Sequence, residues 1–455
     1  MFDPVAMIVT GEAKKPCRQN NRRGKEILPT KPSSPTGRLV VRWAKGLDWR
    51  WRLLIIMPLS FVLFIIVSWQ FSSTNLISLP SSSSSSSVAG RVWEEKKMVN
   101  GSRIAICLVG AARKFELTGP SILKNILLEY PNADLFLHSP LDKDAFKFSL
   151  LRKAPRIAGV RIFKQVNIVE DESQTRVLTS SNSPNGIQGL LQYFNMVEGC
   201  LTMIRAHEER VINSTYEWIV RTRVDGYWSA PLGSSNFVRN TYTIPTGSNY
   251  GGLNDRFGVG DRRTSTVALS RLRLIPQLES SGYQLLNSEA AFKAQLVTSN
   301  VTYQDSLLPF CVLSDRMYDY PPTGYGVPVT SIGSTASLSG AKCRPCRPAC
   351  VGKCVEDVLL GLNRWWSWTE NENMTKVDLC NASGEWEEGW DKTFDKVAGR
   401  ISARMRRKMK SLGFNRCVLN FQEMKKKTAS WWESPSPEEI CRSGLTPQLV
   451  KQKTS

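Results

Sequence analysis

Histidine is scarce in this sequence, whose 455 residues include only His138 and His207. This excludes a metal centre with several histidine ligands. Acidic residues are also few, since the sequence has 40 Asp and Glu but 60 Lys and Arg, which gives a net charge of +20. The sequence lacks the motifs of phosphate-binding loops, zinc proteases, serine hydrolases and dinucleotide-binding turns. The function must therefore be sought in less common patterns.

One long uncharged run is present, the 19 residues of 53–71. As a helix it spans roughly 28 Å, about the thickness of a bilayer core. Basic residues precede the run and no charge follows before Arg91, which predicts a cytosolic amino terminus and a luminal remainder. The alternative, a cleaved signal peptide, requires a charged leader segment of more than 50 residues. We predict a single-pass type II membrane anchor.

Composition divides the rest of the chain. Residues 1–52 form a basic tail, and 72–100 a stem that contains seven consecutive serines. Residues 101–335 resemble a globular domain, and 336–455 are rich in cysteine and tryptophan. Five glycosylation sequons follow the predicted anchor, at Asn100, Asn213, Asn300, Asn373 and Asn381, which is typical of a secretory-pathway protein.

Apolar runs alternate with amphipathic stretches from residue 101 onward. We expect strands at 104–109, 134–137, 161–169 and 217–224, and helices at 119–129, 186–211 and 288–296. This alternation predicts the α/β class, with a mostly parallel sheet flanked by helices. Ligands of such sheets bind beyond the carboxyl ends of the strands.

Chemically informative residues follow three of these predicted strands. Gly110 to Arg113 comes after the first, His138 closes the second, and Arg221, Arg223 and Asp225 close the fourth. Arginines at such an edge can bind phosphate oxygens, while a carboxylate can hold a divalent cation that bridges them. The alternatives are a structural Arg–Asp pair and a histidine that is satisfied within the fold.

Four segments in this order resemble type II membrane glycosyltransferase-like proteins of the nucleotide-diphospho-sugar transferase (GT-A) fold, in particular a plant family of the Golgi. They are IAICLVGAAR (104–113), DLFLHS (134–139), YEWIVRTRVDGYW (216–228) and IPTGSNYGGLNDRFGVG (244–260). The resemblance covers about residues 103–313. It implies a location in the Golgi membrane, a nucleotide-sugar donor and a glycan or glycoprotein acceptor. The predicted luminal location argues against nucleic acid as a partner, despite the net charge of +20.

The resemblance also implies roles for individual residues. Gly110 and Arg113 would contact the nucleotide. From their chemistry alone, His138 could orient a ribose or a phosphate, and Arg221 could bind phosphate oxygens. Arg223 and Asp225 would occupy the position of the metal-binding motif. Asn254 and Arg256 would line the donor sugar or the acceptor. The motif has one carboxylate here instead of two. Dependence on Mn²⁺ or Mg²⁺ is therefore an open alternative, in which Arg221 or Arg223 would supply part of the cation's charge.

Glycosyl transfer with inversion also needs a carboxylate that removes the acceptor proton. Our candidates are Glu289, at the start of a predicted helix, and Asp255, in a glycine-rich segment, with Asp261 as a third carboxylate downstream of Asp225. The structural alternatives are a glutamate that complements a helix dipole and a simple hairpin turn.

The cysteine cluster Cys343, Cys346, Cys350 and Cys354 has a spacing that zinc sites also use. In an oxidising lumen, disulfides are favoured. The seven tryptophans of the same region can stack on sugar rings or pack a small core. If they bind sugar while the α/β domain has no activity, the chain is instead a membrane-anchored lectin-like protein.

Overall fold

The computed structural model describes residues 97–99, 101–181, 183, 185–211, 215–363 and 376–446. These lie within one compact unit, Ser83–Ser455. Among these described residues, no helix combines the length and apolarity needed to cross a bilayer. The predicted tail at 1–52 and the predicted anchor at 53–71 lie outside them, as does the predicted stem except for the final residues described at 97–99.

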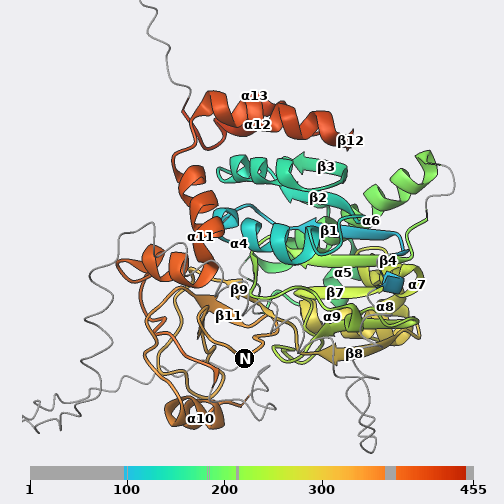
Figure 1. The fold of residues 1–455 in the computed structure, drawn as a ribbon. Helices are drawn as coiled ribbons and strands as arrows, with labels where there is room; N and C mark the ends of the chain where they lie inside the picture. Colours follow the sequence, from blue (N-terminus) through green and yellow to red (C-terminus); the bar gives the residue numbers. More distant parts are fainter. Residues whose placement is uncertain are drawn as a thin grey trace, which may run out of the picture. The chain divides into compact units, whose positions relative to one another are not determined.

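An eight-stranded sheet forms the centre of this unit, in the order β12-β3-β2-β1-β4-β7-β6-β8 (Figure 1). Its strands are β1 (Ile104–Val109), β2 (Asp134–Pro140), β3 (Ile157–Phe163), β4 (Trp218–Arg223), β6 (Thr241–Pro245), β7 (Phe257–Asp261), β8 (Thr302–Ser306) and β12 (Thr428–Trp431). The strands from β12 to β4 are parallel, whereas β7 is antiparallel to β4 and β6. Every residue of β1 is buried, as expected of a strand covered on both faces.

Helices cover both faces of this sheet. One face packs against α4 (Phe115–Ile122), the π-helical turn η2 (Leu123–Leu127), the 3-10 helix η3 (Ala145–Lys153), α11 (Trp390–Lys410), α12 (Phe414–Lys427) and α13 (Pro437–Arg442). The other face packs against α6 (Gly186–Arg210), α7 (Arg262–Leu269) and α9 (Ser288–Thr298). The shorter helices are α5 (Glu172–Val177), η4 (Ser234–Asn236), α8 (Ile275–Ser280) and α10 (Lys353–Leu360). The predicted α/β class with a mostly parallel sheet and flanking helices is confirmed.

A smaller sheet adjoins the first, in the order β10-β11-β9-β5. Its strands are β5 (Gly226–Trp228), β9 (Phe310–Leu313), β10 (Thr330–Ser331) and β11 (Lys342–Arg344). Only Val224 and Asp225 separate β4 from β5, so the chain passes from one sheet to the other at this point. The cysteine-rich region contributes to both sheets, since it supplies β11 and β12.

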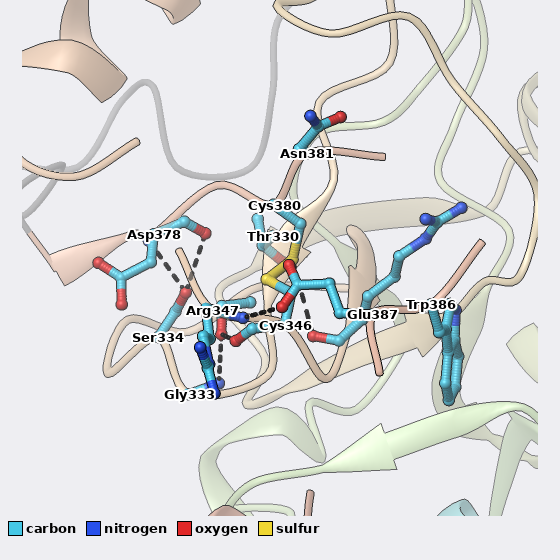
Figure 2. The surroundings of a disulfide bond; sticks show 12 residues. Thr330, Gly333, Ser334, Cys346, Arg347, Asp378, Cys380, Asn381, Trp386 and Glu387 are labelled. Carbon is cyan, nitrogen blue, oxygen red and sulfur yellow. Dashed lines mark hydrogen bonds between the residues drawn. A yellow bond between two sulfur atoms is a disulfide. The ribbon is translucent and has the colours of Figure 1, made fainter. Parts of the chain in front are cut away.

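Ten cysteines form five disulfides. The bonds are Cys107–Cys200, Cys311–Cys343, Cys346–Cys380, Cys350–Cys354 and Cys417–Cys441. The four clustered cysteines therefore belong to three different disulfides, which confirms the prediction of disulfides over a zinc site. Figure 2 shows Cys346–Cys380 beside the hydrogen bond from the Asp378 backbone N–H to Ser334 Oγ, 3.0 Å long.

Most predicted elements have the expected position. The third strand differs: β3 begins at Ile157 and ends at Phe163, before the predicted end at Val169. Gly159 lies within this strand, and glycine is uncommon in strands, which hid its true start. The first helix begins earlier than expected, at Phe115, and continues through η2. The sequon residues Asn300 and Asn381 are exposed, whereas the other three lie outside the described residues.

The Cys107–Cys200 disulfide joins the central strand β1 to α6 and links positions that are 93 residues apart in sequence. The Cys350–Cys354 disulfide links positions that are only 4 residues apart. Because a longer closed loop restricts the unfolded chain more, we expect replacement of both Cys107 and Cys200 by alanine to lower the free energy of unfolding by about 4 kcal/mol. The matched Cys350/Cys354 double variant should lose about 2 kcal/mol. Urea unfolding measures both, and equal losses would contradict this ordering.

Candidate functional site

The strand order of the large sheet reverses between β1 and β4. From β1 the chain adds β2 and β3 on one side, then returns to place β4 on the other. The ends of the two strands lie together, because Val109 pairs with Arg223 and the Val224 N–H donates to the Val109 carbonyl at 2.9 Å. In open α/β sheets, ligands bind beyond the carboxyl ends of the strands at such a reversal.

Gly110 makes the turn after β1. Its φ is +129°, in the region that only glycine adopts readily. A Cβ added here would lie 3.4 Å from the Val224 Cβ, so the turn packs closely against the end of β4. The chain then reaches the exposed Arg113 and enters α4. Thr118 of that helix donates to the Val224 carbonyl at 2.6 Å, which holds α4 to this edge.

Arg223 and Asp225 form a two-pronged ion pair at the junction of the sheets. Arg223 Nε and Nη2 donate to the two carboxylate oxygens of Asp225, each at 2.8 Å. The side chains are 29% and 15% exposed. Burial alone would raise the pKa of Asp225, but the Arg223 guanidinium holds it well below its usual range. Asp225 is therefore an ionised carboxylate that fixes an arginine at the edge.

Asp225 was predicted to bind a divalent cation. Both of its oxygens are engaged by Arg223, and Lys342 and Arg113 add further positive charge nearby. No group of three or more His, Cys, Asp or Glu side chains in the described part of the chain could hold a metal. This donor set does not fit Mn²⁺ or Mg²⁺.

Arg256 and Asn254 are anchored by the segment that leads into β11. Arg256 Nη1 donates to the Gly340 carbonyl at 2.7 Å. Asn254 Nδ2 donates to the Ser339 carbonyl at 3.2 Å and is 1% exposed. Asn254 thus shapes the loop, while the buried Arg256 adds a positive charge that acts on Lys342.

Arg221 and Asp255 belong to a buried polar network. Arg221 is 2% exposed and donates to the Asp255 carbonyl and to Tyr193 Oη. The Asp255 carboxylate accepts from Tyr193 at 3.0 Å and from Ser288 at 2.8 Å, and Arg271 lies 3.8 Å away. Burial opposes ionisation of Asp255, but Arg271 and Arg221 lower its pKa overall. Arg221 therefore positions Asp255 instead of reaching the edge.

Glu289 is in the first turn of α9, where Asn287 Oδ1 caps the helix by accepting from the Ala290 N–H at 2.8 Å. Burial and the charge of Asp255 raise the pKa of Glu289 to about 7. Gly252 packs directly on its backbone, and the Leu253 N–H donates to the Glu289 carbonyl at 3.1 Å. Of the two predicted catalytic carboxyls, only Glu289 can exchange a proton near neutral pH.

His138 packs inside the fold at the end of β2. It is 1% exposed, its Nδ1 lies 2.7 Å from the Met196 carbonyl, and its ring stacks on Phe163 at 4.7 Å. Burial lowers its pKa to about 4, so the ring is neutral. The alternative that we considered, a histidine satisfied within the fold, describes these contacts better than a role at the ligand.

The structure adds residues that sequence reasoning missed. Lys342, Arg271 and Tyr193 come from β11, from the segment after α7 and from α6. No motif marks them, because they meet the predicted residues only through folding.

A cavity of about 590 Å³ lies elsewhere, lined by Lys143, Arg442 and residues near them, and none of the predicted site residues lines it.

A family model described as "Domain of unknown function (DUF7796)" matches residues 99–447. The chain belongs to the DUF7796 family. The match extends from before β1 to beyond α13, so both sheets and the whole candidate site lie within the DUF7796 domain. No curated protein matches the chain.

The raised pKa of Glu289 makes a pH-dependent contribution to stability. The Glu289 carboxyl holds its proton more tightly in the folded chain than in the unfolded chain. Its contribution to stability is therefore complete below the pKa of the unfolded state, near 4.5, and is lost as the pH rises through the folded pKa of about 7. In the wild type, this should lower the free energy of unfolding by on the order of 2 kcal/mol between these pH values. We expect this decrease to be absent in Glu289→Gln, which has no carboxyl group to titrate.

Urea unfolding at several pH values measures this dependence. The exposed Glu209 of α6 offers a matched control, and Glu209→Gln should retain the wild-type slope. The expectation is wrong if Glu289→Gln keeps the same slope as the wild type.

Proposed function

We propose that the chain is a nucleotide-sugar-dependent glycosyltransferase of GT-A-like fold, anchored in the Golgi membrane with its domain in the lumen. It transfers a sugar to a glycan or glycoprotein acceptor. The five disulfides support an oxidising compartment. The strand reversal between β1 and β4 supports a nucleotide site at that edge.

One observation carries the proposal: a cationic edge lies beside a carboxyl group with a near-neutral pKa. The charge of Arg256 acts both on Lys342 at the edge and on Glu289. Such an arrangement supplies the two groups that glycosyl transfer needs, positive charge for the departing diphosphate and a base for the acceptor.

The proposed reaction is a single displacement. The acceptor oxygen attacks the anomeric carbon of the donor sugar as the bond from that carbon to the diphosphate oxygen breaks. Glu289 takes the acceptor proton, and the guanidinium groups of Arg223 and Arg256 stabilise the charge on the leaving diphosphate. Asp255 stays ionised within its network and raises the basicity of Glu289 through its negative charge.

The lectin-like alternative has less support. The described tryptophans of the cysteine-rich region pack against the hydrophobic clusters: Trp386, Trp390, Trp431 and Trp432. Trp386 also donates its indole N–H to the Ser314 carbonyl at 2.9 Å. Trp365, Trp366 and Trp368 lie outside the described residues.

Release of nucleoside diphosphate from a panel of UDP- and GDP-sugars, with glycan acceptors, tests the proposal on the full-length chain. We expect Glu289→Gln to lower kcat by about 10²- to 10⁴-fold with nearly unchanged donor affinity, because it removes proton transfer alone. Asp255→Asn should mainly lower stability, and Glu209→Gln should change neither quantity. If Glu289→Gln and Asp255→Asn both retain full transfer, neither residue is the base.

A further inference from the structure

Lys342 lies at the junction of the two sheets, although more than a hundred residues separate it from Asp225 in sequence. On β11 it pairs with Val312 of β9, and Val312 pairs with Gly226 of β5. The Leu313 N–H donates to the Asp225 carbonyl at 3.0 Å. Neighbouring strands lie about 4.8 Å apart, so the β11 backbone is two strand spacings from the start of β5, the residue after Asp225.

Arg256 comes directly before β7, next to the last pair of the β4–β7 ladder. Thr222 pairs with Phe257 at the end of this antiparallel ladder, so Arg223 follows the ladder on β4 and Arg256 precedes it on the other chain segment. The hydrogen bond from Arg256 to Gly340 also ties this arginine to the segment that carries Lys342.

At the junction of the two sheets, where β4 ends, the positive charge of the side chains exceeds their negative charge. Arg113, Arg223 and Lys342 surround Asp225, and Arg256 adds a further cation beside Lys342. Asp225 has its two oxygens engaged by Arg223, whose Nη1 makes no hydrogen bond to any described residue. Burial and the charges of Arg256 and Arg223 lower the pKa of Lys342 well below its ordinary value.

We infer that Lys342, Arg223 and Arg256 bind the pyrophosphate group of the donor directly, without a bridging divalent cation. The identity of the ligand rests on the proposed function. A pyrophosphate would lie between like charges that otherwise repel one another, and guanidinium groups suit phosphate oxygens. Asp225 acts here as a positioning residue, because it holds the plane of the Arg223 guanidinium.

The Cys311–Cys343 disulfide supports this arrangement. It joins β9 to β11 at the residue that follows Lys342. The same two strands connect Lys342 to β5, so the bond fixes the spacing between the lysine and the Arg223–Asp225 pair. The cysteine-rich region thereby supplies a residue of the binding site.

Calorimetric titration of the full-length chain with inorganic pyrophosphate, UDP and GDP tests the inference, in EDTA and separately with Mn²⁺. Loss of a charge-assisted hydrogen bond should make Lys342→Met weaken pyrophosphate binding about 10- to 100-fold. Lys342→Arg should retain most of it. Lys353 is exposed on α10, and Lys353→Met is the matched control with wild-type affinity.

Thermal unfolding separates binding from folding. Removal of a crowded, half-buried ammonium should leave the Tm of Lys342→Met equal to or above that of the wild type, so weaker binding with an undiminished Tm supports the inference. Affinity that disappears in EDTA and returns with Mn²⁺ overturns it. So does equal affinity of Lys342→Met and Lys353→Met, or a folded wild-type chain that binds no pyrophosphate.

Nucleotide-sugar turnover, measured in parallel, separates this inference from the proposed function. Transfer that requires Mn²⁺ would preserve the glycosyltransferase and overturn the metal-free site. Metal-free pyrophosphate binding through Lys342, with no turnover of any UDP- or GDP-sugar, would preserve the site and overturn the glycosyltransferase.

Discussion

The ion pair between Arg223 and Asp225 is the interaction on which the site depends. It forms where β4 ends and the chain crosses into the second sheet. A partly buried carboxylate needs such a partner, since loss of the arginine would leave its charge uncompensated. The pair also fixes an arginine at the reversal point of the sheet, beside the turn at Gly110. One contact thereby stabilises the junction of the sheets and holds a partly exposed cation at it.

Two carboxyl groups on the same side of the sheet have opposite properties because their surroundings differ. Asp255 has arginine partners and hydrogen-bond donors, which lower its pKa. Glu289 is partly buried beside that negative charge, which raises its pKa to about 7. Pairs of carboxyl groups whose pKa values are driven apart are a common basis for acid and base roles in enzymes. The close contact of Gly252 with the Glu289 backbone keeps the group in this setting.

Local patterns in the sequence were sufficient for much of the fold. The buried strand at Ile104–Val109 and the long helix from Gly186 follow from periodicity alone. The start of β3 could not be predicted in this way, because Gly159 interrupts the apolar pattern of the strand. The joining of β11 and β12 to the sheets also has no local signal, since pairing between distant strands depends on the packed fold.

The candidate site was predictable only in part. Residues at strand ends, such as Asp225, could be found because parallel strands end at a common edge. The direction of each side chain could not be predicted. Arg221 and Arg223 are two residues apart on β4, yet Arg221 is held inside the fold by Asp255, whereas Arg223 pairs with Asp225 at the junction of the sheets. Lys342 was missed because its proximity to Asp225 exists only after β9 and β11 pair.

The central claim is that the Arg223–Asp225 junction binds a diphosphate. A crystal structure of the chain with a nucleoside diphosphate tests this most directly. We expect phosphate oxygens within hydrogen-bond distance of Arg223 Nη1 and Lys342 Nζ. A diphosphate found in the cavity near Lys143 and Arg442, with the junction free of ligand, would contradict it.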